Sequence, residues 1–167
     1  PAFLGVLFLA AEAACPLYIV HNSSPRTVDE IAAAKARGQK VWSETCPQYL
    51  TLDDAAYAGD EPWRFILQPP LRPRAAVNGL WRHLAVGAVD ALGTDHCDYT
   101  REQKTAKDDF TKTPGGLPSL EIALPLMYTA GVVEKRITLS QLVQLMATNP
   151  ARIFGLAPRK GAIAVDA

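Results

Sequence analysis

The stretch AVDALGTDHC (residues 88–97) joins an apolar run to three side chains that bind metals or move protons. The run AVDALGT is typical of a buried strand, and Asp95, His96 and Cys97 follow where such a strand would end. In parallel α/β folds, ligands bind beyond the carboxyl ends of the strands. Asp95 is therefore either a capping residue or a catalytic group, and a partner elsewhere in the chain would decide between the two.

The composition is that of an ordinary globular protein. The 167 residues, 49% hydrophobic and 20% charged, are enough for one domain with a substantial core. Seventeen basic and seventeen acidic residues cancel, so there is no electrostatic footprint for nucleic acid or an anionic membrane. Three widely spaced cysteines do not make a disulfide framework, which favours reduced thiols and a cytoplasmic location.

The first fifteen residues, PAFLGVLFLAAEAAC, have two interpretations. Their apolar core and the AEA triplet resemble a signal peptide, but a positive n-region is missing. The apolar run is also shorter than the ~20 residues that a membrane span needs. We favour an Ala/Leu-rich helix that leads into a buried strand.

Strand and helix patterns alternate along the rest of the chain, which predicts a parallel α/β architecture. Only about three such units are present, too few for a closed eight-stranded barrel. We expect PLYIV to be a strand buried on both faces, RFILQPPL (64–71) to be extended and 97–118 to be a long polar loop. Strands are expected over 16–20, 40–45 and 88–94, and helices over 27–38, 75–87, 119–132 and 138–156.

Polar residues follow each expected strand at its carboxyl end. His21 follows PLYIV, ETCPQYL (44–50) follows KVWS, and Asp95 follows DALGT. A neutral imidazole and a carboxylate at one sheet edge are the ligand types of a hydrolytic zinc site. However, a lone His at a strand end is more often a hydrogen-bonded structural group, and an Asp there is more often a cap. The residue types alone leave both interpretations open.

A thiol-dependent hydrolase is a weaker alternative. His96 is next to Cys97, but adjacent strand residues point to opposite faces, so the imidazole is badly placed to act as a base for this thiol. Cys46 lies near Glu44, which is a carboxylate and not an imidazole. His83 sits within a helical pattern beside Trp81, and we expect it to be structural.

Five motifs occur in an order that resembles the cyclic amidohydrolases, closest to dihydropyrimidinase and D-hydantoinase, with allantoinase as a near relative. The likeness covers about residues 15–165, and five motifs in order are far more specific than any one of them. The motifs are PLYIVHNSS (16–24), ARGQKVWSETCPQYLTLD (36–53), QPPLRP (68–73), LGTDHCDYTREQKTAKDDFTKTPGGLP (92–118) and TNPARIFGLAPRKGAIAV (148–165).

This resemblance implies a fold and a reaction. Such enzymes are eight-stranded (β/α) barrels with a small β-sandwich, and they use two divalent metal ions, expected to be zinc, bridged by a carboxylated lysine. They open the ring of a cyclic amide or imide, such as a dihydropyrimidine or a 5-substituted hydantoin, as homodimers or homotetramers. Residues 1–160 would then be a partial barrel, about strands six to eight with the closing helices, and 161–167 the first residues of a truncated β-sandwich.

The resemblance also implies roles for four residues. His21 would bind one metal, and Asp95 would bind the other and carry the proton during ring opening. Gln68 and Gly115 would hold the substrate imide, mainly through backbone atoms. Family members commonly have Ser at the position of Gln68, Asn at that of Gly115 and Val at that of Asn22, so the shape of the pocket is expected to differ.

The remaining metal ligands of the family, a His-x-His motif, the lysine and a third His, would lie upstream of Pro1. We therefore expect the sequence to represent the later part of such an enzyme and to be inactive by itself. Two alternatives remain. The protein would be non-catalytic, with a structural or partner-binding role, if that other part has lost its ligands. It would be a self-associating half-barrel if its open face pairs with a second copy.

Overall fold

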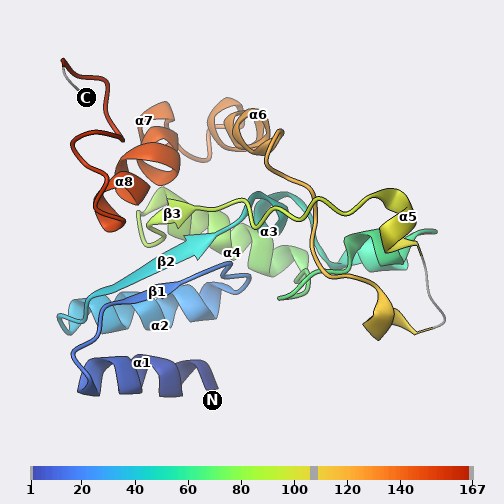
Figure 1. Ribbon diagram of the computed structural model, residues 1–167, viewed down its shortest axis with the longest axis horizontal. Coiled ribbons are helices and arrows are strands. Elements are labelled where there is room, and N and C mark those ends of the chain that lie inside the picture. The colour runs from blue at the N-terminus through green and yellow to red at the C-terminus, as the bar shows by residue number, and fades with distance from the viewer. Residues whose placement is uncertain (1, 106–108, 166–167) are drawn as a thin grey trace.

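The computed structural model describes residues 2–105 and 109–165. At its centre is a three-stranded parallel sheet in which each strand pairs with the next one along the chain (Figure 1). This confirms the predicted parallel α/β architecture. In sheet order, the strands are β1 (Leu17–Ile19), β2 (Val41–Thr45) and β3 (Ala91–Leu92).

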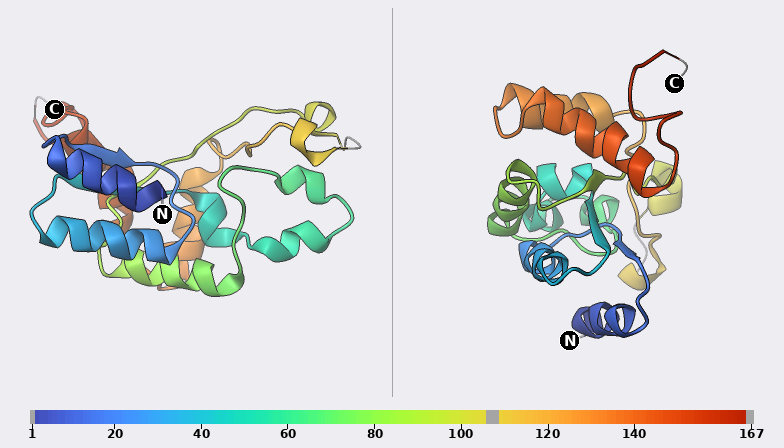
Figure 2. Two further views of the ribbon diagram at one scale, coloured as in Figure 1. Left: turned by 90° about the horizontal axis from the view of Figure 1, so that it is seen from below. Right: turned by 90° about the vertical axis from the view of Figure 1, so that its left-hand side faces the viewer.

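Helices precede or connect the strands and lie in a row along one side of the sheet (Figures 1 and 2). Helix α1 (Ala2–Glu12) precedes β1, α2 (Pro25–Ala36) connects β1 to β2, and α4 (Arg74–Ala85) leads to β3. Proline in the first turn suits α2, because the missing N–H has no helical partner there. All three helices confirm the sequence predictions, with bounds shifted by a few residues.

The sheet is buried on one face only, and β2 shows this by its alternation. Val41, Ser43 and Thr45 are buried toward the helices, whereas Trp42 and Glu44 are half-exposed on the other face. Strand β1 is half-buried at all three positions. The prediction that it is buried on both faces is therefore wrong for this chain, because the described residues cover mainly its helical face.

The C-terminal helices pack beside β3 (Figure 1). Both predicted helices are present, but each contains a π-helical turn that widens its winding. In chain order the segments are α6 (Ala123–Met127), η4 (Tyr128–Val133), α7 (Leu139–Val143), η5 (Gln144–Thr148) and α8 (Asn149–Ile153).

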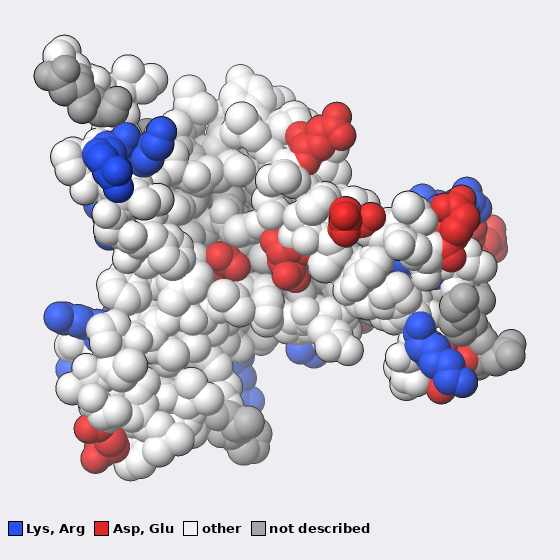
Figure 3. Space-filling model, in the orientation of Figure 1, with Lys and Arg blue, Asp and Glu red and all other residues white. Residues whose placement is uncertain are grey.

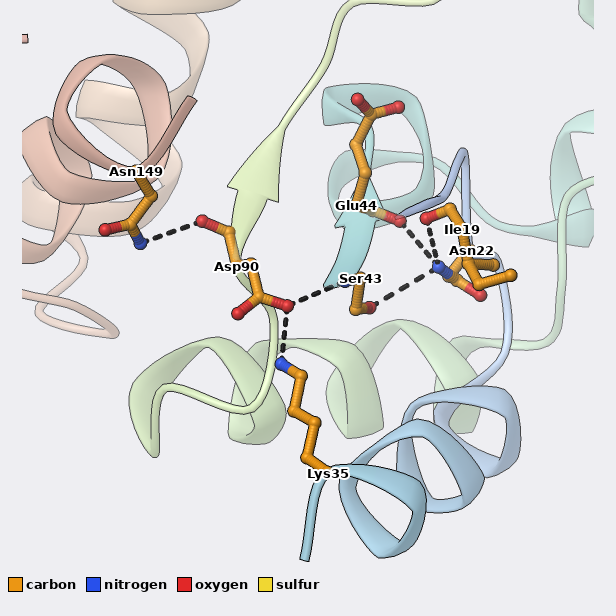
Figure 4. Close-up of polar contacts among 7 residues, drawn as sticks. All are labelled: Ile19, Asn22, Lys35, Ser43, Glu44, Asp90 and Asn149. Atoms are coloured by element: carbon orange, nitrogen blue, oxygen red, sulfur yellow. Dashed lines mark hydrogen bonds and ion pairs between the residues drawn. The ribbon is translucent and has the colours of Figure 1, made fainter. Parts of the chain in front are cut away.

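Asp90 ties the start of β3 to three other elements, as Figure 4 shows. Its carboxylate accepts hydrogen bonds from the Lys35 ammonium of α2 and, at 2.6 Å, from the backbone N–H of Ser43 in β2. Its backbone carbonyl accepts a bond of 2.9 Å from the side-chain amide of Asn149 in α8. These bonds connect the helical layer, the sheet and the C-terminal helices.

A lobe of short segments lies beyond the carboxyl ends of the strands (Figure 1). The predicted extended segment 64–71 begins inside a 3-10 turn, and the long loop 97–118 contains short helices. Residues 106–108 of that loop lie outside the described residues. The lobe contains η1 (Asp54–Ala58), η2 (Pro62–Phe65), α5 (Arg101–Lys104) and η3 (Phe110–Lys112), while α3 (Pro47–Thr51) links β2 to it.

The end of the chain adds no element to this fold. Residues 161–165 form bends and a turn without a strand, and 166–167 lie outside the described residues, so the start of a β-sandwich at 161–167 stays a prediction. Among all described residues, no helix is both long and apolar enough to cross a membrane.

Candidate active site

His21 and Asp95 lie at the same edge of the sheet, two residues after β1 and three residues after β3. Both are half-buried, and both have left-handed backbone conformations, with φ of +39° and +47°. For residues with a Cβ this conformation costs about 1–2 kcal/mol, and such strain is concentrated at functional sites. Asp95 caps no helix in the part of the chain that the structure describes, so the capping interpretation is not supported there.

The side chains of both residues are available to a ligand. Within residues 2–105 and 109–165, neither the His21 imidazole nor the Asp95 carboxylate makes a hydrogen bond or an ion pair; His21 bonds only through its backbone N–H. By contrast, the carboxylates of Asp53, Asp90 and Asp109 all accept hydrogen bonds. An unpartnered imidazole and carboxylate at one edge are the donor types that zinc and similar ions bind.

These two donors fit a metal site only as part of a larger set. The described residues contain no group of three His, Cys, Asp or Glu side chains that could hold a metal ion. A metal at this edge would therefore need further ligands from outside these residues.

Glu44 is the side chain at this edge that the sequence analysis did not identify as a site residue. Its carboxylate accepts a hydrogen bond of 2.8 Å from the Tyr18 hydroxyl and one of 3.3 Å from the His21 N–H. Gly93 faces the same carboxylate so closely that a Cβ there would lie 2.4 Å from the carboxyl carbon. Glu44 thus contacts both the turn that carries His21 and the strand end that leads to Asp95.

The electrostatics of this edge follow from its carboxylates. Burial and the neighbouring Glu44 raise the pKa of the Tyr18 hydroxyl, which keeps it protonated as the donor to Glu44. Figure 3 shows acidic side chains near the middle of this face of the molecule, while most Lys and Arg side chains lie nearer its rim.

The sequence did contain a signal for Glu44. Side chains alternate between the two faces of a strand, and this alternation along β2 could have placed Glu44 on the open face.

Asn22, next to His21, has a structural reason to be polar. It is buried, and its side-chain amide donates to the carbonyls of Ile19 (3.0 Å) and Glu44 (2.9 Å), as Figure 4 shows. The backbone carbonyl of Asn22 accepts a hydrogen bond of 2.7 Å from the Thr45 hydroxyl. Asn22 therefore fixes the end of β1 to β2 directly beside His21.

The two residues predicted to hold substrate, Gln68 and Gly115, are neighbours in space. The Cβ position of Gly115 lies 3.7 Å from the Gln68 Cγ and 3.7 Å from the Leu67 Cα. Both residues are exposed. A pocket of about 650 Å³, a size typical of small-molecule sites, opens beside Gln68, with a largely apolar and aromatic lining that includes Tyr57, Trp63, Ile66, Leu67 and Phe110.

The other two histidines, His96 and His83, make contacts that stabilise the fold. The His96 imidazole accepts hydrogen bonds from the N–H groups of Ser119 (3.0 Å) and Leu120 (3.1 Å), so it holds the end of the loop. His83 lies 3.2 Å from the Asp29 carboxylate between α4 and α2, which confirms its predicted structural position.

Cys46 is fully buried. Burial, together with the nearby Glu44 and Asp95, raises the pKa of its thiol. A thiol held in its protonated form is a poor nucleophile, which argues against the thiol-dependent alternative at this position.

Comparisons with known proteins find relatives that match most of the chain. No protein-family model matches the chain. A D-phenylhydantoinase from Escherichia coli is 44% identical over 151 residues, which are 89% of this chain and 33% of that protein. The crystal structure of a dihydropyrimidinase from Brevibacillus agri superimposes with a TM-score of 0.92 at 36% identity, covering 98% of this chain and 36% of that chain.

A third relative broadens the comparison. The structure of an L-hydantoinase (dihydropyrimidinase) from Arthrobacter aurescens superimposes with a TM-score of 0.91 at 37% identity, over 98% of this chain and 36% of that one. The chain thus spans about a third of the length of the relatives it matches. The remaining two thirds of those proteins have no counterpart in the 167 residues.

Proposed function

We propose that this chain, which is similar to hydantoinases and dihydropyrimidinases, belongs to the cyclic amidohydrolases and forms part of a metal-dependent enzyme that opens cyclic amide rings by hydrolysis. The observation that carries this proposal is the pair of His21 and Asp95 at one edge of a parallel sheet. Both have left-handed backbones and unpartnered side chains within the described residues. Similarity over 89% of the chain to a D-phenylhydantoinase supports the substrate class.

His21 and Asp95 would have different roles in the reaction. His21 would bind a divalent ion, zinc by our expectation, through a ring nitrogen of its neutral imidazole. When bound, such an ion would polarise the ring carbonyl and lower the pKa of its bound water to about 7, which would supply a nucleophile at neutral pH. Asp95 would also be a metal ligand. Its carboxylate would take the proton from the attacking water and deliver it to the ring nitrogen, because an amide anion is a poor leaving group.

Gln68 and Gly115 would hold the imide of the ring. Backbone N–H and C=O groups at these neighbouring positions would match the alternating donors and acceptors of an imide, which keeps the scissile carbonyl oriented toward Asp95. A dihydropyrimidine or a 5-substituted hydantoin fits this description. The intact protein is proposed to be cytoplasmic and to work as a homodimer or homotetramer.

The experiment that tests the proposal uses the complete natural gene product, purified without chelators. Metal content is measured by elemental analysis, and ring opening is assayed on dihydrouracil, hydantoin and allantoin. We expect divalent metal and activity on at least one ring. Replacing the general base with an isosteric amide, Asp95→Asn, should lower kcat by roughly 100-fold to 10,000-fold.

The exposed Asp98→Asn, three residues further along the chain, is the matched control and should retain activity. A folded natural protein that opens none of the three rings would contradict the proposal and favour a non-catalytic, partner-binding relative. An Asp95→Asn variant with wild-type kcat would remove Asp95 from the mechanism.

A further inference from the structure

Lys104, in the short helix α5, is a buried cation to which the proposed chemistry gives no role. It is only 4% exposed, and its ammonium group donates hydrogen bonds to two backbone carbonyls, those of Ile66 (2.8 Å) and Gly116 (2.7 Å). Within the described residues no carboxylate forms an ion pair with it. Burying a charge is costly unless its hydrogen-bonding groups are satisfied, so these two carbonyls stabilise the ammonium.

Each of the two carbonyls belongs to a segment that carries a predicted substrate residue. Ile66 lies two residues before Gln68, and Gly116 directly follows Gly115. The segments also touch one another, because the Gly116 N–H donates a hydrogen bond of 3.0 Å to the Ile66 carbonyl. The Ile66 carbonyl therefore accepts two donors, and Lys104 closes the contact from the side.

The same loop is fastened to the strand end that carries Asp95. Gly116 has φ of +130°, and a Cβ at this position would lie 2.3 Å from the Cys97 sulfur, so the loop backbone runs directly against that side chain. The Cys97 N–H donates a hydrogen bond of 3.1 Å to the Leu117 carbonyl. Gly116 is thus held between Lys104 on one side and Cys97, two residues after Asp95, on the other.

We propose that Lys104 is a positioning residue for ring opening: its ammonium clamps the Ile66 and Gly116 carbonyls and so fixes the backbones of Gln68 and Gly115 relative to Asp95. This inference rests on the proposed function. In this role Lys104 acts through the two carbonyls and not by direct contact with the substrate or a metal. Its effect is to keep the edge that holds the ring at a constant distance from the group that moves the proton.

The lowered pKa of Lys104 is consistent with an ammonium group that is removed from water between the two segments. Desolvation lowers the pKa of this ammonium from its ordinary value, because the surroundings disfavour the charged form. An exposed lysine that touched these carbonyls by chance would keep its hydration. The side chain is therefore held between the two segments at a cost to its charged form.

The test replaces Lys104 in the complete natural gene product with Met, which has a similar length but no donor, and with Arg, which keeps the charge and several donors. Lys112→Met is the matched control, because Lys112 is an exposed lysine of the same lobe. Misplacing reacting groups by about 1 Å costs roughly 100-fold in rate. We expect Lys104→Met to lower kcat/KM by about 10-fold to 100-fold, mostly through kcat, because the ring would still bind but at the wrong distance from Asp95.

Three readouts separate positioning from mere stability. Metal content per chain should stay at the wild-type value in all variants, because within the described residues Lys104 makes no hydrogen bond or ion pair with His21 or Asp95. Hydrogen exchange at the amides of 115–117 should accelerate in Lys104→Met. Lys104→Arg should recover part of the loss in kcat/KM, and Lys112→Met should match the wild type.

The outcomes that overturn the inference differ from those that overturn the proposed function. If the wild type opens rings and folded Lys104→Met does so with an unchanged kcat/KM, Lys104 is only structural. If Lys104→Met does not fold, the same comparison is made with Lys104→Gln, which is shorter and uncharged, and wild-type kinetics with wild-type exchange at 115–117 overturns the clamp. A wild type that opens no ring overturns the proposed function, and the clamp with it.

Discussion

Single residues decide what the edge of the sheet can do, and Cys46 illustrates this. Cys46 is fully buried, and burial together with the charges of Glu44 and Asp95 raises the pKa of its thiol. The surroundings therefore favour the neutral thiol, which leaves the negative charge of the edge to the carboxylates. A cysteine here fills space without competing for a metal or a substrate carbon.

The raised pKa of Cys46 predicts a pH-dependent loss of stability. A group whose pKa is raised on folding stabilises the folded state below its unfolded pKa, and this contribution is lost as the pH rises above it. In the unfolded chain the thiol ionises near pH 8.5, so by pH 10 the wild type should lose about 2 kcal/mol relative to Cys46→Ala.

Urea unfolding of both proteins at pH 7 and pH 10 measures this difference. The exposed Cys15 provides the control, because Cys15→Ala should leave the pH dependence unchanged. Parallel stability curves for the wild type and Cys46→Ala would show that the thiol ionises as easily in the folded state as in the unfolded one.

At the scale of elements, the approach of β3 to β2 depends on the absence of a side chain at position 93. The Glu44 carboxylate occupies the volume that a Cβ of residue 93 would need. That carboxylate also accepts the N–H of His21 at the end of β1. A methyl group at position 93, just after β3, would therefore displace the Glu44 carboxylate and disturb its hydrogen bond to the His21 N–H at the end of β1.

Gly93→Ala should displace the Glu44 carboxylate and destabilise the protein by about 1–3 kcal/mol, the usual cost of overpacking. In a Glu44→Ala background the same substitution should cost much less, because the obstructing group is gone. A double-mutant cycle in urea unfolding measures this coupling.

Gly59→Ala is the matched control, since the nearest atom to its Cβ position is the Ala56 carbonyl oxygen at 3.7 Å. Additive free-energy changes for Glu44→Ala and Gly93→Ala would mean that the carboxylate moves aside without loss.

Most of the elements could be predicted from the sequence, because their causes are local. PLYIV and KVWSET are apolar or β-branched runs of strand length, and helix α2 shows its apolar spacing and its closing glycine, Gly38, in the sequence. The π-helical turns of the C-terminal helices left no such signal. The apolar residues of these two segments show the spacing of an ordinary helix, so the wider winding of the π-helical turns could not be predicted.

The candidate site could be predicted only in part, for a physical reason. His21 and Asp95 follow strands directly, so their place at the edge follows from topology, and the resemblance supplies their roles. Glu44 and Lys104 depend on contacts between segments far apart in the chain. Lys104 lies in a polar loop where a lysine is expected to be solvated, and nothing nearby in the sequence shows the two carbonyls that bury it.

As a whole, the molecule is a small parallel sheet with a row of helices along one side, and helix α1 at the start of the described chain lies far from the last described residues (Figure 1). Helix α1 and the C-terminal segments from Leu120 onward carry many exposed apolar side chains. Large contiguous apolar surfaces are uncommon on monomeric proteins and favour association. Among the exposed side chains are Leu4, Phe8, Leu9, Leu120, Ile122, Leu124, Tyr128 and Phe154.

The isolated 167-residue chain should therefore self-associate at micromolar concentrations. Analytical ultracentrifugation should show species heavier than the 18.1 kDa chain, and their proportion should grow with concentration. Leu124→Glu combined with Phe8→Glu should shift the distribution toward the monomer, while the exposed polar change Gln103→Glu should not. A monodisperse 18.1 kDa species at all concentrations would show that these surfaces are tolerated in water.

The order of the strands also has a consequence for how the molecule is made. Each strand pairs with its successor, so contacts within the sheet join residues that are near in sequence compared with those of a sheet whose strands are shuffled. Low contact order favours fast folding, and domains commonly begin to fold while still being synthesised. The residues that pair β1 with β2 all lie before Thr45 in the chain. During synthesis, each strand of the sheet can therefore pair with the strand that left the ribosome just before it.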